Sequence, residues 1–169
     1  EYHHILSTQG RTFDTQEELD WIQRRIANCF DLSDLGPQFR LSEATDAAVD
    51  LRGIMLRVPL ADWDTLPDAE FLEALTGEDQ LKRYRFLDVP IELILIETGD
   101  RAGEWVISKE TRTNARAGWN RMRDLDPIAG TGDMHRLHFF EPGWLIPSAL
   151  IRSLPPWAGW EIWGQALWQ

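Results

Sequence analysis

Hydrophobic residues in the first half of the chain recur at the spacing of amphipathic helices. The first such pattern predicts a helix that begins near Asp14 or Thr15, where residues 15–18 have the form of a capping box. Its buried stripe would contain Leu19, Ile22, Ile26, Cys29 and Phe30. A second helix is expected over about residues 42–57. Its buried side would contain Ala44, Ala47, Ala48, Leu51, Ile54, Met55 and Val58. A short third helix would begin at Pro67, because proline is favoured at the first helical position.

The second half of the chain changes to the patterns of strands. Ile91–Ile96 is apolar on both faces except for Glu92, as in a central strand that is covered on both sides. The weak alternation over residues 82–87 predicts a neighbouring strand. Residues 98–103 have the length and composition of a hairpin turn, and residues 104–107 would return from it as the partner strand.

Another helical pattern follows the hairpin. Ser108, with Thr111 three residues later, is expected to cap a helix that runs to about Leu125. Its inner side would contain Ala115, Trp119, Met122 and Leu125. Residues 137–140 predict a last strand. The order of elements favours the α+β class, with helices at the N-terminus, a small, largely antiparallel sheet, and C-terminal helices.

Composition is consistent with one soluble domain and a distinct end. The chain has 169 residues, of which 43% are hydrophobic, and this is enough to form a core without disulfides. We expect residues 1–154 to form the domain, with residues 1–12 loosely ordered, and residues 155–169 to form a Trp-rich juxtamembrane segment. The net charge of −11 argues against nucleic acid as a partner, because phosphate backbones repel a polyanion. Cys29, the single cysteine, is expected to be a small buried hydrophobe.

Residue patterns give little indication of catalysis. The four histidines are expected to lie on the surface and not to converge, so we predict no metal site and no cofactor. Acid pairs occur at Asp31 with Asp34 and at Asp62 with Asp64, but each lies in polar sequence. A hydrolase that used such a pair would need one acid to be desolvated. We therefore expect a non-enzymatic chain and keep a small hydrolase as a minor alternative.

Two groups of residues are candidates for contacts with partners. The first is a set of basic residues on the helix after Ser108: Lys109, Arg112, Arg116, Arg121 and Arg123. They could form a docking face, either for lipid headgroups or for another subunit. The alternative is a solvated face that pairs with the chain's own carboxylates.

The second set consists of Trp157, Trp160, Trp163 and Trp168. Indole rings concentrate at the headgroup level of a bilayer, so these four predict a membrane interface or subunit contact. The alternative is a Trp-rich helix that packs on the core.

Five segments, in order, resemble motifs of one protein family. They are Phe30–Pro37, Leu51–Leu60, Gly103–Thr111, Pro142–Pro147 and Gly164–Gln169. The first resembles an LDLS-x-(L/V)-PP motif, the third a GEx(L/V)FSxxT step, and the last two resemble PGxLIP and GQPLWQW endings. The family is that of the large bacterial members of the small-conductance mechanosensitive channel (MscS) family, in their extracytoplasmic N-terminal region.

The resemblance covers about residues 12–169, with two departures. The segment 61–88 is longer and more acidic than the family pattern, and Ala166 stands where the family usually has proline. The acidic segment could therefore have a function of its own.

The resemblance implies a role outside the membrane. In such proteins the last motif leads into the first membrane span, and the channel releases solutes after osmotic downshock. The chain would be a periplasmic accessory domain, regulatory or structural, on the periplasmic side of the bacterial inner membrane. Its partners would be the rest of the same channel chain, neighbouring subunits, and the membrane surface at its C-terminal end. The alternative is a periplasmic ligand-binding sensory domain of another membrane protein, with a pocket lined by Trp105, Trp119 and the basic helix.

Overall fold

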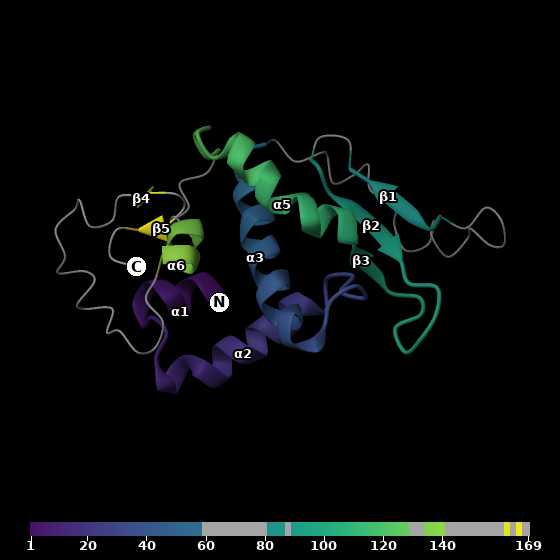
Figure 1. Ribbon diagram of the computed structural model, residues 1–169, viewed down its shortest axis with the longest axis horizontal. Helices are drawn as coiled ribbons and strands as arrows, with labels where there is room; N and C mark the ends of the chain where they lie inside the picture. The colour runs from purple at the N-terminus through teal and green to yellow at the C-terminus, as the bar shows by residue number, and fades with distance from the viewer. Residues whose placement is uncertain (59–80, 87–88, 129–133, 141–160, 163–164, 167–169) are drawn as a thin grey trace. The chain divides into compact units, whose positions relative to one another are not determined.

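Two compact units make up the computed structural model. It describes residues 1–58, 81–86, 89–128, 134–140, 161–162 and 165–166. The first unit consists of residues 1–22 and 132–169, and the second of residues 23–131. Helices together with a small antiparallel sheet confirm the predicted α+β class (Figure 1). The helix predicted from Pro67 lies outside the described residues.

Two long helices form the centre of the second unit. Helix α3 (Pro37–Met55) packs against helix α5 (Lys109–Met122), which crosses it in Figure 1. α3 begins five residues before the predicted start at Ser42. Pro37 is the first helical residue, where its fixed φ suits a helix and its missing N–H leaves no bond unmade.

Helix α5 begins where the sequence predicts it. The Ser108 hydroxyl accepts a hydrogen bond from the backbone N–H of Thr111 at 3.2 Å, which confirms the predicted N-cap. The helix ends at Met122, and Leu125 lies beyond it and is 54% exposed. The prediction that Leu125 belongs to the inner side is therefore wrong, because the helical spacing does not extend that far.

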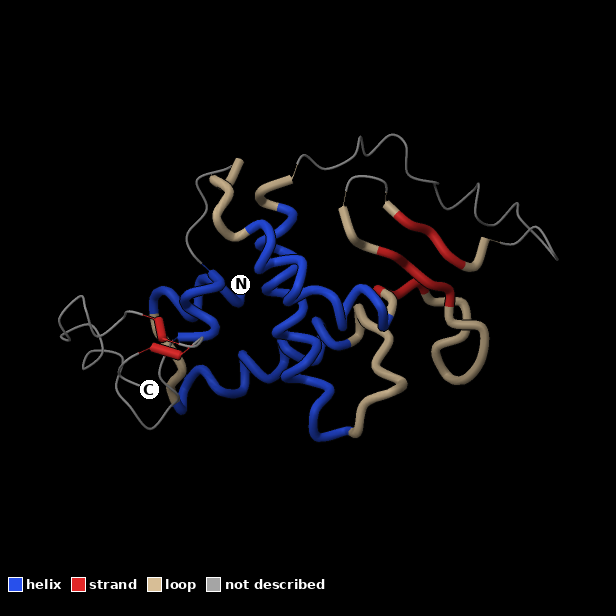
Figure 2. The backbone as a smooth tube through the Cα atoms, turned by 45° about the horizontal axis from the view of Figure 1, so that its top comes forward, coloured by secondary structure: helices blue, strands red, loops and turns tan. Residues whose placement is uncertain are grey.

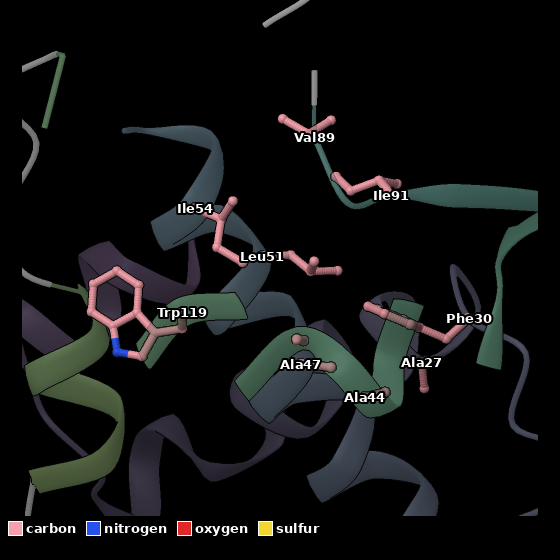
Figure 3. Packing of buried hydrophobic residues seen from close by; sticks show 10 residues of the cluster. Ala27, Phe30, Ala44, Ala47, Leu51, Ile54, Val89, Ile91 and Trp119 are labelled. Atoms are coloured by element: carbon pink, nitrogen blue, oxygen red, sulfur yellow. The ribbon is translucent and has the colours of Figure 1, made fainter. Parts of the chain in front are cut away.

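Apolar side chains fill the space between these helices and the sheet (Figure 3). The buried members of this core are Ala27, Phe30, Ala44, Ala47, Leu51, Ile54, Val89, Ile91, Ala115 and Trp119. The two helices are in tight contact at Gly53, where an added Cβ would lie 2.5 Å from Cζ3 of the Trp119 ring. Only a residue without a Cβ leaves room for this ring.

The sheet of the second unit has three antiparallel strands, in the order β1 (Arg83–Arg85), β2 (Glu92–Leu95) and β3 (Trp105–Ile107). They lie side by side in Figure 2. β2 is central, as predicted, but Leu93, Ile94 and Leu95 are only half-buried, so the expected cover on both faces is incomplete. Gly99 and Gly103, in the turn before β3, have φ of 89° and 92°, a region that favours glycine.

The chain after helix α2 (Phe13–Ala27) runs beside β3. Asp31 donates its backbone N–H to Ile107 O at 2.9 Å, and the Ile107 N–H donates to Cys29 O at 2.8 Å. Phe30 is buried and Cys29 is exposed. The prediction that Cys29 is buried is therefore wrong. The helical spacing stops at Ala27, and Cys29 lies in the turn that follows, where its backbone N–H donates to Ile26 O at 2.9 Å.

Helix α2 begins earlier than predicted. The backbone N–H of Thr15 donates to the Thr12 hydroxyl at 3.4 Å, and the Thr12 N–H donates to the Thr15 hydroxyl at 3.0 Å. The observed capping pair is therefore Thr12 with Thr15, whereas the predicted capping box covered residues 15–18. The observed pair begins three residues earlier. Leu19 and Ile22 are buried, as expected.

The first unit contains two short helices that pack against each other, α1 (Tyr2–Thr8) and α6 (Met134–Phe140). The prediction of a loosely ordered segment over residues 1–12 is wrong, because Tyr2, Ile5 and Leu6 give α1 a buried face. The predicted strand over residues 137–140 is also wrong, since that segment is part of α6. A short apolar run does not distinguish a strand from a buried helix.

Near the C-terminus, β4 (Glu161–Ile162) pairs with β5 (Gln165–Ala166) in antiparallel fashion. The described end of the chain therefore contains a short strand pair that the sequence analysis did not predict. None of the described helices has both the length and the apolar character needed to cross a bilayer.

Candidate functional site

Basic residues of α5 meet acidic residues of the second unit. Arg112 donates from Nη2 to both carboxylate oxygens of Asp34, at 2.7 and 2.8 Å. The Lys109 ammonium lies 3.6 Å from the same carboxylate. Further along α5, Arg116 Nε lies 3.1 Å from Oδ2 of Asp50, whose side chain is only 2% exposed. These ion pairs join α5 to α3 and to the loop before α3.

Arg112 is not part of an exposed docking face, and this member of the predicted set is wrong. Its side chain is only 5% exposed, and its Nε is buried without a hydrogen-bond partner. Arg112 precedes the buried Ala115 and Trp119 by three and seven residues, and this spacing places all three on the inner face of the helix. The other four predicted residues are exposed: Lys109, Arg116, Arg121 and Arg123.

Electrostatics keep the Asp34 carboxyl ionised. Partial burial raises its pKa, but the hydrogen bond and positive charge of Arg112 outweigh this effect, with a smaller contribution from Lys109. The pKa of Asp34 therefore lies below its usual value of 3.8. A carboxyl held in its charged form suits an ion pair and does not suit a general acid.

A second group of charges lies on the sheet, and the sequence analysis missed its arginines. The Glu92 side chain is 11% exposed, and its two oxygens lie 3.3 Å from Arg83 Nη1 and 3.4 Å from Arg85 Nη2. Through its backbone, Glu92 also donates to the Thr111 hydroxyl at 2.9 Å and accepts from the Ser108 N–H at 2.8 Å. The sequence did contain a signal for these arginines. Glu92 is an isolated charge in an apolar strand, and a buried carboxylate needs positively charged or hydrogen-bonding partners.

The first unit contains a buried polar group that joins α1 to α6. The Tyr2 hydroxyl lies 2.8 Å from Nδ1 of His138, and Arg11 Nη2 lies 3.3 Å from both atoms. His138 is buried, so the prediction that all histidines lie on the surface is wrong for this one. Within the described ranges, no three His, Cys, Asp or Glu side chains are grouped to hold a metal ion.

The predicted membrane-interface residues, Trp157, Trp160, Trp163 and Trp168, lie outside the described residues. Of the acidic segment 61–88, only residues 81–86 are described. No family model, curated protein or solved structure matches the chain.

Proposed function

We propose that the chain is a non-enzymatic accessory domain of a mechanosensitive channel of the MscS family, on the periplasmic side of the bacterial inner membrane. The family assignment comes from the five sequence segments described above. The observation that carries an accessory role is that three of these segments, distant in sequence, pack into one framework. They are Phe30–Pro37, the described part of Leu51–Leu60, and Gly103–Thr111.

All three segments contribute side chains to the hydrophobic core: Phe30 from the first, Leu51 and Ile54 from the middle one, and Ile107 from the third. The first and third meet at the bridge between Phe30 and Ile107, and Asp34 of the first segment lies 3.6 Å from Lys109 of the third. The middle segment supplies Gly53, which makes room for the Trp119 ring. Its Arg57 stacks over that ring, 4.5 Å from the centroid. The residues that resemble the family motifs thus hold the fold together, as expected of a structural module.

The charges and the core support this role over the two alternatives. The lowered pKa of Asp34 and its paired carboxylate do not suit the acid of a hydrolase. The Trp119 ring fits tightly against α3 at Gly53, whereas a sensory pocket would need this ring to line an open space. A rigid unit of this kind would influence a channel by binding its closed and open states with different affinity.

Partner contacts would use the exposed members of the basic set on α5, which are Lys109, Arg116, Arg121 and Arg123. Neighbouring subunits and lipid headgroups both offer anionic groups to such side chains. The Trp-rich end would provide the contact with the bilayer surface.

The test begins with the full reading frame, which should encode several hydrophobic spans after residue 169. The whole protein and a variant lacking residues 1–154 are then expressed in bacterial cells without their own mechanosensitive channels. Patch recordings should show tension-activated currents from both, with a shifted threshold in the deletion. A hydrophilic continuation, or a correctly inserted whole protein that carries no tension-activated current, would contradict the proposal.

A further inference from the structure

Two arginines on β1 share one face of the sheet. Arg83 and Arg85 are separated by one residue, so their side chains point the same way, and β1 pairs Arg85 directly with Glu92 of β2. The alternate residues Tyr84 and Phe86 meet edge to face on the opposite side, with ring centroids 5.3 Å apart. Phe86, the residue after β1, packs against the core, so the alternation of side chains places both guanidinium groups on the outer face of the sheet.

Glu92 satisfies only part of the hydrogen-bonding capacity of these arginines. Each guanidinium reaches one oxygen, at 3.3 and 3.4 Å, which is long for a charge-assisted hydrogen bond. The side chains of Arg83 and Arg85 are 64% and 75% exposed, whereas that of Glu92 is 11% exposed. Most of the five N–H donors of each guanidinium therefore face solvent.

Among the described residues, the charge on this face is positive although the chain is acidic. Two guanidinium groups stand against one carboxylate, and the nearby Lys82 is paired with Glu97 at 2.9 Å. At physiological ionic strength, carboxylates more than about 8 Å away act only weakly on this face, because they are largely screened. The group that fits is an anion with several oxygens, able to bridge two planar donors.

We propose that Arg83 and Arg85 form a binding site for a phosphate group, with Glu92 as the anchor that holds the two guanidinium groups together. A phosphate monoester carries nearly two negative charges and three acceptor oxygens, and arginine binds such groups bidentately. The group could belong to a soluble phosphate or to a phospholipid headgroup. The site does not depend on the channel assignment, since it rests only on the sheet.

The test is an NMR titration of the 169-residue chain with inorganic phosphate at constant ionic strength, with chloride as the reference anion. The Nε–H signals of Arg83 and Arg85 should shift and saturate with a dissociation constant in the millimolar range. Arg85→Gln should weaken binding about tenfold, the loss expected for charge-assisted hydrogen bonds. Arg83→Gln should do the same, which gives a second variant if the first is poorly folded.

Lys82→Gln is the matched control, because it removes the same charge from an adjacent residue that already has a partner. It should change the affinity by less than about twofold, as expected for an exposed charge that is not part of the site. Vesicles of phosphatidic acid, compared with phosphatidylcholine alone, test the lipid source by co-sedimentation. Arginine-dependent binding to phosphate, to the acidic vesicles or to both supports the site and identifies the source. Binding to neither, or an equal loss in Lys82→Gln and the arginine variants, overturns it.

Discussion

Replacing Asp34 by Asn should destabilise the second unit more than replacing its partner Arg112 by Met. The two side chains differ in burial, with 5% of Arg112 exposed and 27% of Asp34. Without the Asp34 charge, the Arg112 guanidinium stays buried with Glu43 as its nearest acid, at 3.9 Å, and with an unpartnered Nε. Without the Arg112 charge, Asp34 can be hydrated, and Met keeps the packing of the apolar stem.

The burial of each partner sets the expected magnitudes. Removing one partner of a fully buried pair costs about 3–5 kcal/mol. Since Asp34 is partly exposed and Glu43 is close, we expect about 2–3 kcal/mol for Asp34→Asn and about 1 kcal/mol for Arg112→Met. The double variant should cost less than Asp34→Asn and about as much as Arg112→Met, because it leaves no buried charge without a partner.

Native-state hydrogen exchange provides the assay, because the protection of core amides such as those of Ile54 and Val106 reports on the second unit itself. Glu97→Gln is the matched control, since its pair with Lys82 is about half exposed at both ends and should contribute less than about 0.5 kcal/mol. The reasoning is refuted if Arg112→Met is the more damaging variant, or if Asp34→Asn behaves like the control.

The lowered pKa of Asp34 adds a pH dependence with a definite sign. A carboxyl whose pKa is lower in the folded state stabilises the fold above its unfolded value, near 3.8, and this stabilisation is lost as the pH falls through the folded value. The difference in stability between the native chain and Asp34→Asn, measured from about pH 6 to about pH 3, should therefore stay constant above about pH 5 and shrink below about pH 4. A difference that is constant over this range would show that the Asp34 charge is not responsible.

Three further substitutions or reactions test other parts of the structure. Gly53→Ala should cost about 1–3 kcal/mol, because its Cβ would lie 2.5 Å from the Trp119 ring. Gly118→Ala, whose Cβ would lie 3.0 Å from the flexible end of Ile54, should be nearly neutral, and a thermal melt that ranks them the other way would contradict this packing. Tyr2→Phe should cost about 1 kcal/mol by removing the hydrogen bond to His138, measured as faster exchange of the α1 amides, and unchanged exchange would argue against that bond. Cys29 should react with a thiol reagent almost as fast in the folded chain as in urea, and strong protection would contradict its exposed position.

Local chemistry made some elements readable from the sequence. The cap of α5 needs only Ser108 and Thr111, three residues apart, and the turn before β3 needs glycine at positive φ. The cap and the turn both depend on residues that are close in sequence, so the residue types alone predict them. The predicted core residues of α3 are buried or half-buried for the same reason, since their helical spacing is regular.

Tertiary contacts decide the features that the sequence did not reveal. Arg112 could have been assigned to the inner face of α5 from its spacing to Ala115 and Trp119, but its partner Asp34 is 78 residues away in sequence. Cys29 continues the helical spacing of apolar residues, and no glycine or proline beside Ala27 indicates that α2 ends there. In each case the deciding contact is with an element distant in sequence, and periodicity contains no information about such contacts.

The first turn of α5 is where the helices and the sheet of the second unit are fixed to one another. The backbone N–H of Glu92 in β2 donates to the Thr111 hydroxyl, and the Glu92 carbonyl accepts from the Ser108 N–H. The next residue of α5, Arg112, holds the loop before α3 through Asp34. A phosphate group on Arg83 and Arg85 would change the charge around the Glu92 carboxylate, and the main chain of Glu92 is already bonded to this turn. Any effect of binding at the sheet on this turn would be transmitted through the two main-chain hydrogen bonds of Glu92, which join β2 to the start of α5.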